Sequence, residues 1–181
     1  MYFSHEVFLF LWKYVEMNYQ KIIQSKIFLN FAEVSEQIAR WKNSREKIVF
    51  TNGCFDLVHR GHIESLAISA GKGSKLIIGL NTDSSVTLLK GAGRPLIDQE
   101  SRAFMLAALT FVDAVVLFEE ETPYGLIKNI LPDVLVKGND YKIEEIAGHD
   151  VVLANGGEVQ AIDLLPGYST SSLISKIKLL K

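Results

Sequence analysis

Short apolar segments alternate with amphipathic stretches along most of this chain, and that alternation constrains the fold more than any other feature. Each segment is five to seven residues long and almost continuously apolar, so it predicts a strand buried on both faces. Helices in between predict right-handed crossovers and a parallel sheet. We therefore predict an α/β three-layer sandwich of about five parallel strands with helices on both faces. The predicted strands are 47–53, 75–81, 113–118, 133–137 and 158–163.

Start and stop signals mark the helices between these strands. Thr82 and Asp83 follow the second strand and predict a helix N-cap, whereas Gly71 in the C′ position is predicted to end the helix over 60–70. Pro123 predicts the first turn of another helix. The predicted helices are 35–41, 60–70, 98–110, one that opens at 122–123, and 169–180.

The first 44 residues precede this alternation, and we interpret them as an N-terminal helical extension to an α/β domain over 45–181. Their apolar run at 8–12 is too short to span a bilayer and lacks the flanks of a secretory signal, so no membrane partner is expected. Met17 offers a second start, so residues 1–16 are either a start-site artefact or an appended helix. Exposed apolar surface on the extension would suit a homodimer.

Composition narrows the class of protein. Hydrophobic residues make up 48% of the chain and charged residues 22%, which is an ordinary globular balance. The formal net charge of -2 speaks against a general nucleic-acid binder, so any phosphate chemistry must rest on a few local cations. The single cysteine, Cys54, excludes an internal disulfide and fits a reducing, cytoplasmic compartment.

Chemically suggestive residues follow the predicted strands. In open parallel sheets, ligands bind beyond the carboxyl ends of the strands. Because several such segments would meet at one edge of the sheet, we expect a ligand site there. The segments are 52–62, 81–90, 137–140 and 166–171.

Two histidines at the start of the helix predicted over 60–70 carry the strongest signal. His59 and His62 would flank its first turn, where free amides and the helix dipole already favour an anion. Two imidazoles add donors for phosphoryl oxygens, and Gly61 permits close approach of a nucleotide. Two other readings remain open: a pair of unrelated surface histidines, or a metal site with Cys54, for which no fourth ligand is evident.

The segment around these histidines, TNGCFDLVHRGH at 51–62, resembles the GxFDxxHxGH signature of the cytidylyltransferase-like family of nucleotidyltransferases. Further segments match in the family's order: KGAGRP, DQESR, LPDVLVKGNDYKIEEIAG and GYSTSSLI. Within the family, this set is similar to the adenylyltransferases that act on heptose 1-phosphate. The likeness covers about residues 46–178 and implies a Rossmann-like nucleotidyltransferase domain over 45–181.

The resemblance implies one reaction. AMP passes from ATP to heptose 1-phosphate, which gives ADP-heptose and pyrophosphate for lipopolysaccharide core or related glycan precursor synthesis. ATP and a sugar 1-phosphate are then the partners. Mg²⁺ enters with ATP, held by phosphate oxygens and water, and no protein side chain is expected to bind the metal.

The resemblance also implies the site residues. The catalytic residues would be His59, His62 and Lys90. The nucleotide-binding residues would be Cys54, Phe55, Gly61, Gly138, Asp140, Gly167, Tyr168, Ser169 and Thr170. Phosphate or sugar contacts would come from Asn52, Asp56, Asn81, Asp83, Arg94, Arg102 and Lys137.

Several of these residues also have a purely structural interpretation. Lys90 could be a solvated surface lysine, and Asp83 a helix cap. Arg102 lies inside a predicted helix, where a salt bridge is as reasonable as a phosphate contact. Ser169 and Thr170 could cap the last helix, and Asp140 could order a turn.

Two alternative functions stay open. A cytidylyltransferase that acts on glycerol 3-phosphate or another small alcohol phosphate would share the histidine motif, but segment 119–123 has no lysine to bind such an acceptor. A non-catalytic nucleotide-binding protein of the same fold belongs to a different class. Release of pyrophosphate separates that alternative from an enzyme.

Overall fold

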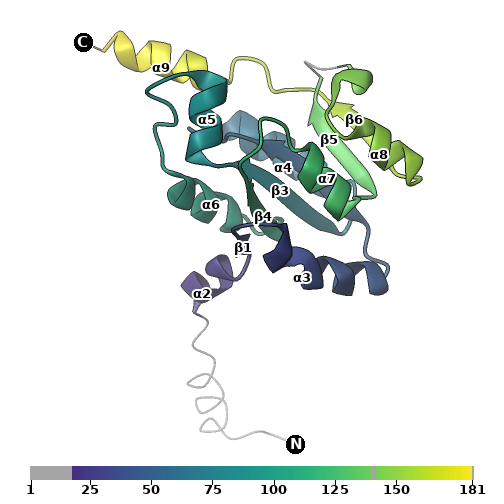
Figure 1. The fold of residues 1–181 in the computed structure, drawn as a ribbon. Coiled ribbons are helices and arrows are strands. Elements are labelled where there is room, and N and C mark those ends of the chain that lie inside the picture. The colour runs from purple at the N-terminus through teal and green to yellow at the C-terminus, as the bar shows by residue number, and fades with distance from the viewer. Residues whose placement is uncertain (1–17, 140–141, 181) are drawn as a thin grey trace, which may run out of the picture.

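A parallel β-sheet forms the centre of the protein (Figure 1). The computed structural model describes residues 18–139 and 142–180. Within these ranges the sheet has six strands in the order β1-β4-β3-β2-β5-β6, and every neighbouring pair is parallel. The strands are β1 (Ile27–Phe28), β2 (Ile48–Gly53), β3 (Lys75–Asn81), β4 (Ala114–Phe118), β5 (Val134–Gly138) and β6 (Glu158–Ile162).

Helices cover both faces of this sheet, which confirms the predicted three-layer α/β sandwich (Figure 1). One core cluster packs α4 and α6 on the sheet, and the other packs α3, α7 and α8 on the opposite face. The helices are α2 (Tyr19–Gln24), α3 (Phe31–Asn43), α4 (Arg60–Ala70), α5 (Asp83–Lys90), α6 (Gln99–Ala107), α7 (Tyr124–Ile130), η1 (Ile143–Glu145), α8 (His149–Ala154) and α9 (Thr170–Lys178).

Strand β2 shows why the sheet must be covered on both faces. Val49 points into the cluster under α4 and α6, whereas Ile48 and Phe50 point into the cluster under α3 and α7. All three side chains are completely buried. Successive side chains of a strand point to opposite faces, so a continuous apolar strand needs a helix layer on each side.

Strand β1 was not predicted. It consists of Ile27 and Phe28, which lie in the segment assigned to a helical extension, and it pairs with Val115 and Val116 of β4 at the sheet edge. Two residues are too few to show a strand pattern in a sequence. The division of the chain at residue 44 stays a prediction, and residues 1–17 lie outside the described residues.

Three helix ends also differ from the predictions. Gly71 is the C-cap of α4 and has a right-handed backbone, φ -66°, so it does not occupy the predicted C′ position. Pro123 stands one residue before α7, as its N-cap. Helix α6 ends at Ala107, three residues before the predicted end. No helix in the described ranges combines the length and the apolar character that crossing a bilayer requires.

The buried sheet predicts that truncation of two isoleucines, one buried and one exposed, has very different effects on the free energy of unfolding. Ile77→Ala in β3 should lower the free energy of unfolding by about 2–5 kcal/mol, because it leaves a cavity in a closely packed core. The matched change Ile68→Ala, on the 41% exposed side chain in α4, should cost less than about 1 kcal/mol. Urea unfolding measures both, and equal losses would contradict the assigned core.

Candidate active site

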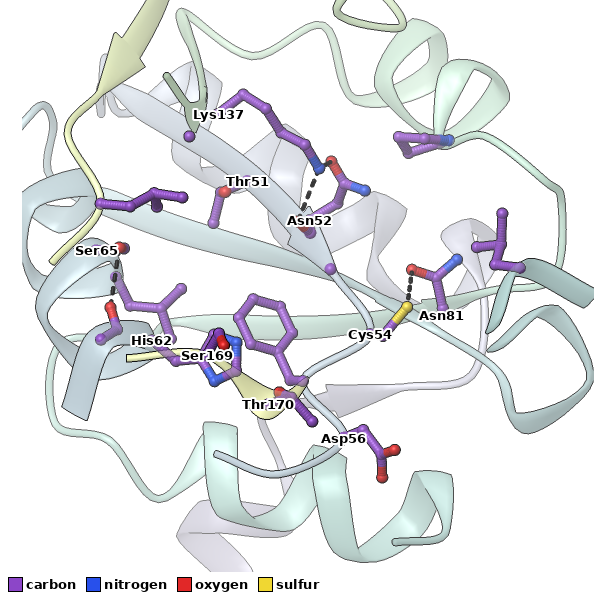
Figure 2. Close-up of a pocket in the computed structure, with 18 of the residues that line it drawn as sticks. Thr51, Asn52, Cys54, Asp56, His62, Ser65, Asn81, Lys137, Ser169 and Thr170 are labelled. Carbon is purple, nitrogen blue, oxygen red and sulfur yellow. Dashed lines mark hydrogen bonds between the residues drawn. The ribbon is translucent and has the colours of Figure 1, made fainter. Parts of the chain in front are cut away.

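A cavity of about 760 Å³ opens at the carboxyl ends of β2, β3 and β5. Its lining comes from the turn after β2, the first turn of α4, the end of α5 and the segment that leads into α9 (Figure 2). This volume is typical of a small-molecule site. The structure therefore brings together the segments that were predicted to meet at this edge of the sheet.

Two stacked histidine rings form part of the cavity wall. His59 is the N-cap of α4, and its Nδ1 accepts a hydrogen bond from the His62 backbone N–H at 3.3 Å. The ring centroids lie 3.8 Å apart at an interplanar angle of 15°. His59 Nε2 and His62 Nδ1 are covered and have no hydrogen-bond partner among the described residues. The pair thus holds hydrogen-bonding capacity that the described part of the protein does not use.

Burial controls the charge of this pair. It lowers the pKa of His59, and it lowers the pKa of His62 to about 4, with the nearby His59 as the second cause and a hydrogen bond to the Leu57 backbone opposing them. Both imidazoles are therefore neutral at neutral pH. A bound anion would favour their protonated forms.

Gly61 lets the segment before α9 approach the first turn of α4. A Cβ at Gly61 would lie 2.9 Å from the Tyr168 Cβ and 3.1 Å from the His59 ring, so a side chain there would displace its neighbours. The Arg60 guanidinium stands over the Tyr168 ring at 5.9 Å from its centroid. These contacts place Tyr168 beside His59 in the lining of the cavity, with the two ring centroids 6.3 Å apart.

Ser169, the residue before α9, has two roles, and Thr170 is the first residue of this helix. Ser169 and Thr170 line the cavity, and the Ser169 hydroxyl also accepts from the Ser172 backbone N–H at 3.1 Å as the N-cap of α9. The capping interpretation of Ser169 is therefore present in the structure. Gly167 does not line the cavity, and its φ of +83° serves the turn before it.

Polar side chains from β2 and β5 line another part of the wall (Figure 2). The Lys137 ammonium donates to the backbone oxygen of Asn52 at 3.3 Å and to its Oδ1 at 3.2 Å. Gly138 follows on the same strand and also lines the cavity. Asp140 lies outside the described residues, so its predicted role stays a prediction.

Cys54 and Asn81 meet at the ends of β2 and β3 (Figure 2). The Cys54 thiol donates to Asn81 Oδ1 at 3.8 Å, and Asn81 Nδ2 donates to the Ser85 hydroxyl at 2.9 Å. Burial raises the pKa of Cys54 despite several nearby cations. The thiol is therefore protonated at neutral pH and acts as a wall residue rather than a nucleophile.

The partners of the Asp56 carboxylate all come from the loop between α5 and α6. Its side chain is almost fully buried and accepts from Arg94 and from the backbone amides of Leu96 and Ile97, at 2.7 and 3.0 Å for the amides. Burial alone would raise the pKa of Asp56, but the Ile97 amide and the Arg94 side chain hold it below its usual value. Asp56 and Arg94 line the cavity as an ion pair.

Two predicted contact residues do not reach the cavity. Arg102 is completely buried, and Asp83 pairs with it at 2.6 Å. Neither belongs to the cavity lining. Arg102 therefore has the salt-bridge interpretation in place of the predicted phosphate or sugar contact, and Asp83 is its partner. Asp83 is also the first residue of α5, and Thr82 is its N-cap, as predicted.

Several further segments of the wall had no residue named as a site residue from the sequence. These are residues 121–123 after β4, 145–147 at the end of η1, and 164–165 after β6. The first was considered only for its lack of a lysine, and the second only as part of a motif that resembles the family. The first and the third follow strand ends, which is a signal that could have drawn attention to them.

The family model of the cytidylyltransferase-like proteins matches residues 50–175, which contain the histidine pair and every residue that lines the cavity. This chain belongs to the cytidylyltransferase-like family. The match confirms the family that the motif around the histidines predicted, and with it the nucleotidyltransferase class.

Two similar proteins are both named bifunctional protein HldE. The one from Azorhizobium caulinodans is 55% identical over 141 residues, which cover 78% of this chain and 29% of that protein. The one from Magnetococcus marinus is 49% identical over 154 residues, which cover 85% of this chain and 32% of that protein. This cytidylyltransferase-like chain thus spans less than a third of the length of these relatives.

A solved structure supports the same fold. The crystal structure of the lipopolysaccharide core biosynthesis protein from Thermoplasma volcanium superposes with a TM-score of 0.54 at 27% sequence identity. The match covers 66% of this chain and 97% of that protein.

The buried state of His62 predicts a pH dependence of stability. Its folded pKa of about 4 lies below the ordinary histidine value of about 6.5, so between these values the unfolded chain binds a proton that the folded protein does not. The contribution of the neutral His62 side chain to the free energy of unfolding is present above pH 6.5 and is lost as pH falls towards 4. The stability of the wild type relative to His62→Gln should therefore shrink over this range in urea unfolding. A difference that is constant with pH would show that His62 titrates normally.

Proposed function

We propose that this chain transfers AMP from ATP to heptose 1-phosphate and forms ADP-heptose and pyrophosphate. The observation that carries the proposal is the stacked pair of His59 and His62 on the wall of a cavity that Lys90 and Thr170 also line. The resemblance of its motifs to the heptose 1-phosphate adenylyltransferases supports the acceptor. So does the similarity to a lipopolysaccharide core biosynthesis protein.

The proposed reaction is a single in-line displacement. A phosphate oxygen of heptose 1-phosphate forms a bond to the α-phosphorus of ATP. The bond from that phosphorus to the oxygen that bridges to the β-phosphorus breaks, and pyrophosphate leaves with the electron pair. No protein nucleophile takes part, so the enzyme contributes positioning and electrostatic stabilisation.

The histidine pair would stabilise the charge on the reacting phosphates. His59 Nδ1 accepts from the backbone, so in the neutral ring the proton is on Nε2, which is then a donor. The free backbone amides in the first turn of α4 lie at the positive end of the helix dipole, so they also favour an anion there. Donors that are in place before the reaction need no reorganisation when charge develops.

Cations and hydroxyls on the other walls would complete the phosphate site. Lys90 ends α5 and lines the cavity, where its ammonium would balance the departing pyrophosphate. Ser169 and Thr170 start α9, whose first amides would bind phosphate oxygens. Asn52 and Lys137 at the ends of β2 and β5 would contact the sugar or the ribose.

Mg²⁺ would enter with ATP. The described ranges contain no group of three His, Cys, Asp or Glu side chains placed to hold a metal ion. The Asp56 carboxylate is already committed to Arg94 and two backbone amides. Phosphate oxygens and water would therefore hold the ion, which neutralises phosphate charge when it is bound.

The cavity wall formed by residues 121–123 argues against a small alcohol phosphate as the acceptor substrate. Residues 121–123 line the cavity and include no cation that could bind a second phosphate. The intact pair of His59 and His62, together with Lys90, argues against a non-catalytic nucleotide-binding protein.

We also propose a cytoplasmic location and a homodimer. The unpaired thiol of Cys54 suits the cytoplasm, and the exposed Tyr19 and Ile22 of α2 support a homodimer.

Loss of one histidine should separate turnover from folding. His62→Ala should lower kcat for pyrophosphate release from ATP and heptose 1-phosphate about a hundredfold or more, the usual cost of removing one preorganised donor. His149→Ala, at the start of α8 and outside the cavity lining, is the matched control and should keep wild-type turnover.

Circular dichroism should show that both variants are folded. A folded His62→Ala variant with wild-type turnover would remove the histidine pair from the mechanism. A wild-type protein that binds ATP but releases no pyrophosphate with any sugar 1-phosphate would refute the proposed function itself.

A further inference from the structure

Arg102 of α6 joins four separate parts of the fold from a fully buried position. Its Nη1 donates to the backbone oxygens of Cys54 at 2.6 Å and Asn81 at 2.9 Å. Its Nε donates to the Ile97 oxygen at 3.0 Å, and its Nη2 to Asp83 Oδ1 at 2.6 Å. Each nitrogen of the guanidinium therefore has a partner.

Two of these four partners, Cys54 and Asn81, line the candidate active site, and the other two lie at the two ends of the segment that carries Lys90. Cys54 lies in the turn from β2 to the histidine pair, and Asn81 is the last residue of β3. Asp83 is the first residue of α5, and Ile97 ends the loop between α5 and α6. Arg102 thus links the turn before the histidines to both ends of the segment that carries Lys90.

Stability alone does not account for a charge in this position. Burying a guanidinium carries a large desolvation cost, and apolar side chains of similar volume often stabilise a core at least as well. The planar fork of arginine can hold several acceptors in one fixed arrangement, which an apolar side chain cannot do. The geometry therefore points to a role in holding these segments at set positions.

The loop between α5 and α6 is held at its later part. Gly91 and Gly93 have φ values of +91° and +88°, and no atom lies within 4 Å of where a Cβ would stand at either. Residues 94–97 are held by Asp56, which accepts from the Arg94 side chain and from the Leu96 and Ile97 amides, and by the Thr87 hydroxyl, which donates to the Arg94 oxygen at 2.7 Å. Arg102 adds its bond to the Ile97 oxygen, so it is one of the anchors at this end of the loop.

We propose that Arg102 is a positioning residue that acts through Lys90. It anchors Asp83 at the start of the helix that ends in Lys90, and Ile97 at the end of the loop that follows. Both anchors together set the position of Lys90, which lines the cavity that the histidines also line. This role rests on the proposed function of the site, in which Lys90 faces the reacting phosphates.

A double-mutant cycle tests whether the two residues act through each other. Arg102→Lys keeps the charge but loses the fork, and it should lower kcat about tenfold to a hundredfold, the loss expected when a catalytic group is displaced by less than about 1 Å. The KM for ATP should change less than about twofold. In a Lys90→Ala background the same change should cost almost nothing. Arg40→Lys, on exposed Arg40 of α3, is the matched control.

Limited trypsin digestion tests the position of the loop without using activity. Cleavage after Lys90 should be several-fold faster in Arg102→Lys than in the wild type, because the loop is released from one anchor. Cleavage after Lys128 in α7 reports general opening of the protein and should stay unchanged. If Arg102→Lys does not fold, Asp83→Asn weakens the same ion pair at a 42% exposed carboxylate and takes its place in both experiments.

Each result decides one claim. Additive losses of kcat in the cycle, or equal acceleration at Lys90 and Lys128, would show that Arg102 only stabilises the fold and would overturn the proposal. A wild type without pyrophosphate release would refute the proposed function. In that case, the rate of cleavage after Lys90 still decides whether Arg102 holds the loop.

Discussion

Burial of the sheet on both faces is the constraint on which the rest of the structure depends. Strands such as β2 and β3 are apolar towards both faces, so helices must cover each face and few polar side chains lie between the layers. Polar side chains therefore gather mainly where the strands end. The carboxyl ends of β2, β3 and β5 meet in one cavity, and the first turn of α4 adds its free amides there.

The fold follows from the sequence because its signals are local and repeated. Strand β3 and helix α4 have the predicted bounds, since a run of apolar side chains and a helix with clear ends each stand out alone. Ile27 and Phe28 form an edge strand that depends on β4, far along the chain, so no local pattern marks it.

The site was predictable where one segment carries the chemistry and not where partners come from distant segments. His59 and His62 lie three residues apart and were recognised, and the structure places both on the cavity wall. Arg102 meets acceptors 48 and 21 residues away in the chain, so its burial and its partners could not be deduced from a helical pattern. Its predicted contact with a ligand gives way to a position beneath the site, where it joins the segments around Lys90.

The central claim is that the paired imidazoles face a bound triphosphate. Long-range ¹H–¹⁵N NMR of the histidine rings, during titration with a non-hydrolysable ATP analogue and Mg²⁺, tests it directly, since the chain has four histidines to assign. The account predicts large shifts of the ring nitrogens of His59 and His62, in the direction of hydrogen-bonded or protonated imidazole, and small shifts for His149. Binding of the analogue with no change at His59 and His62 would contradict it.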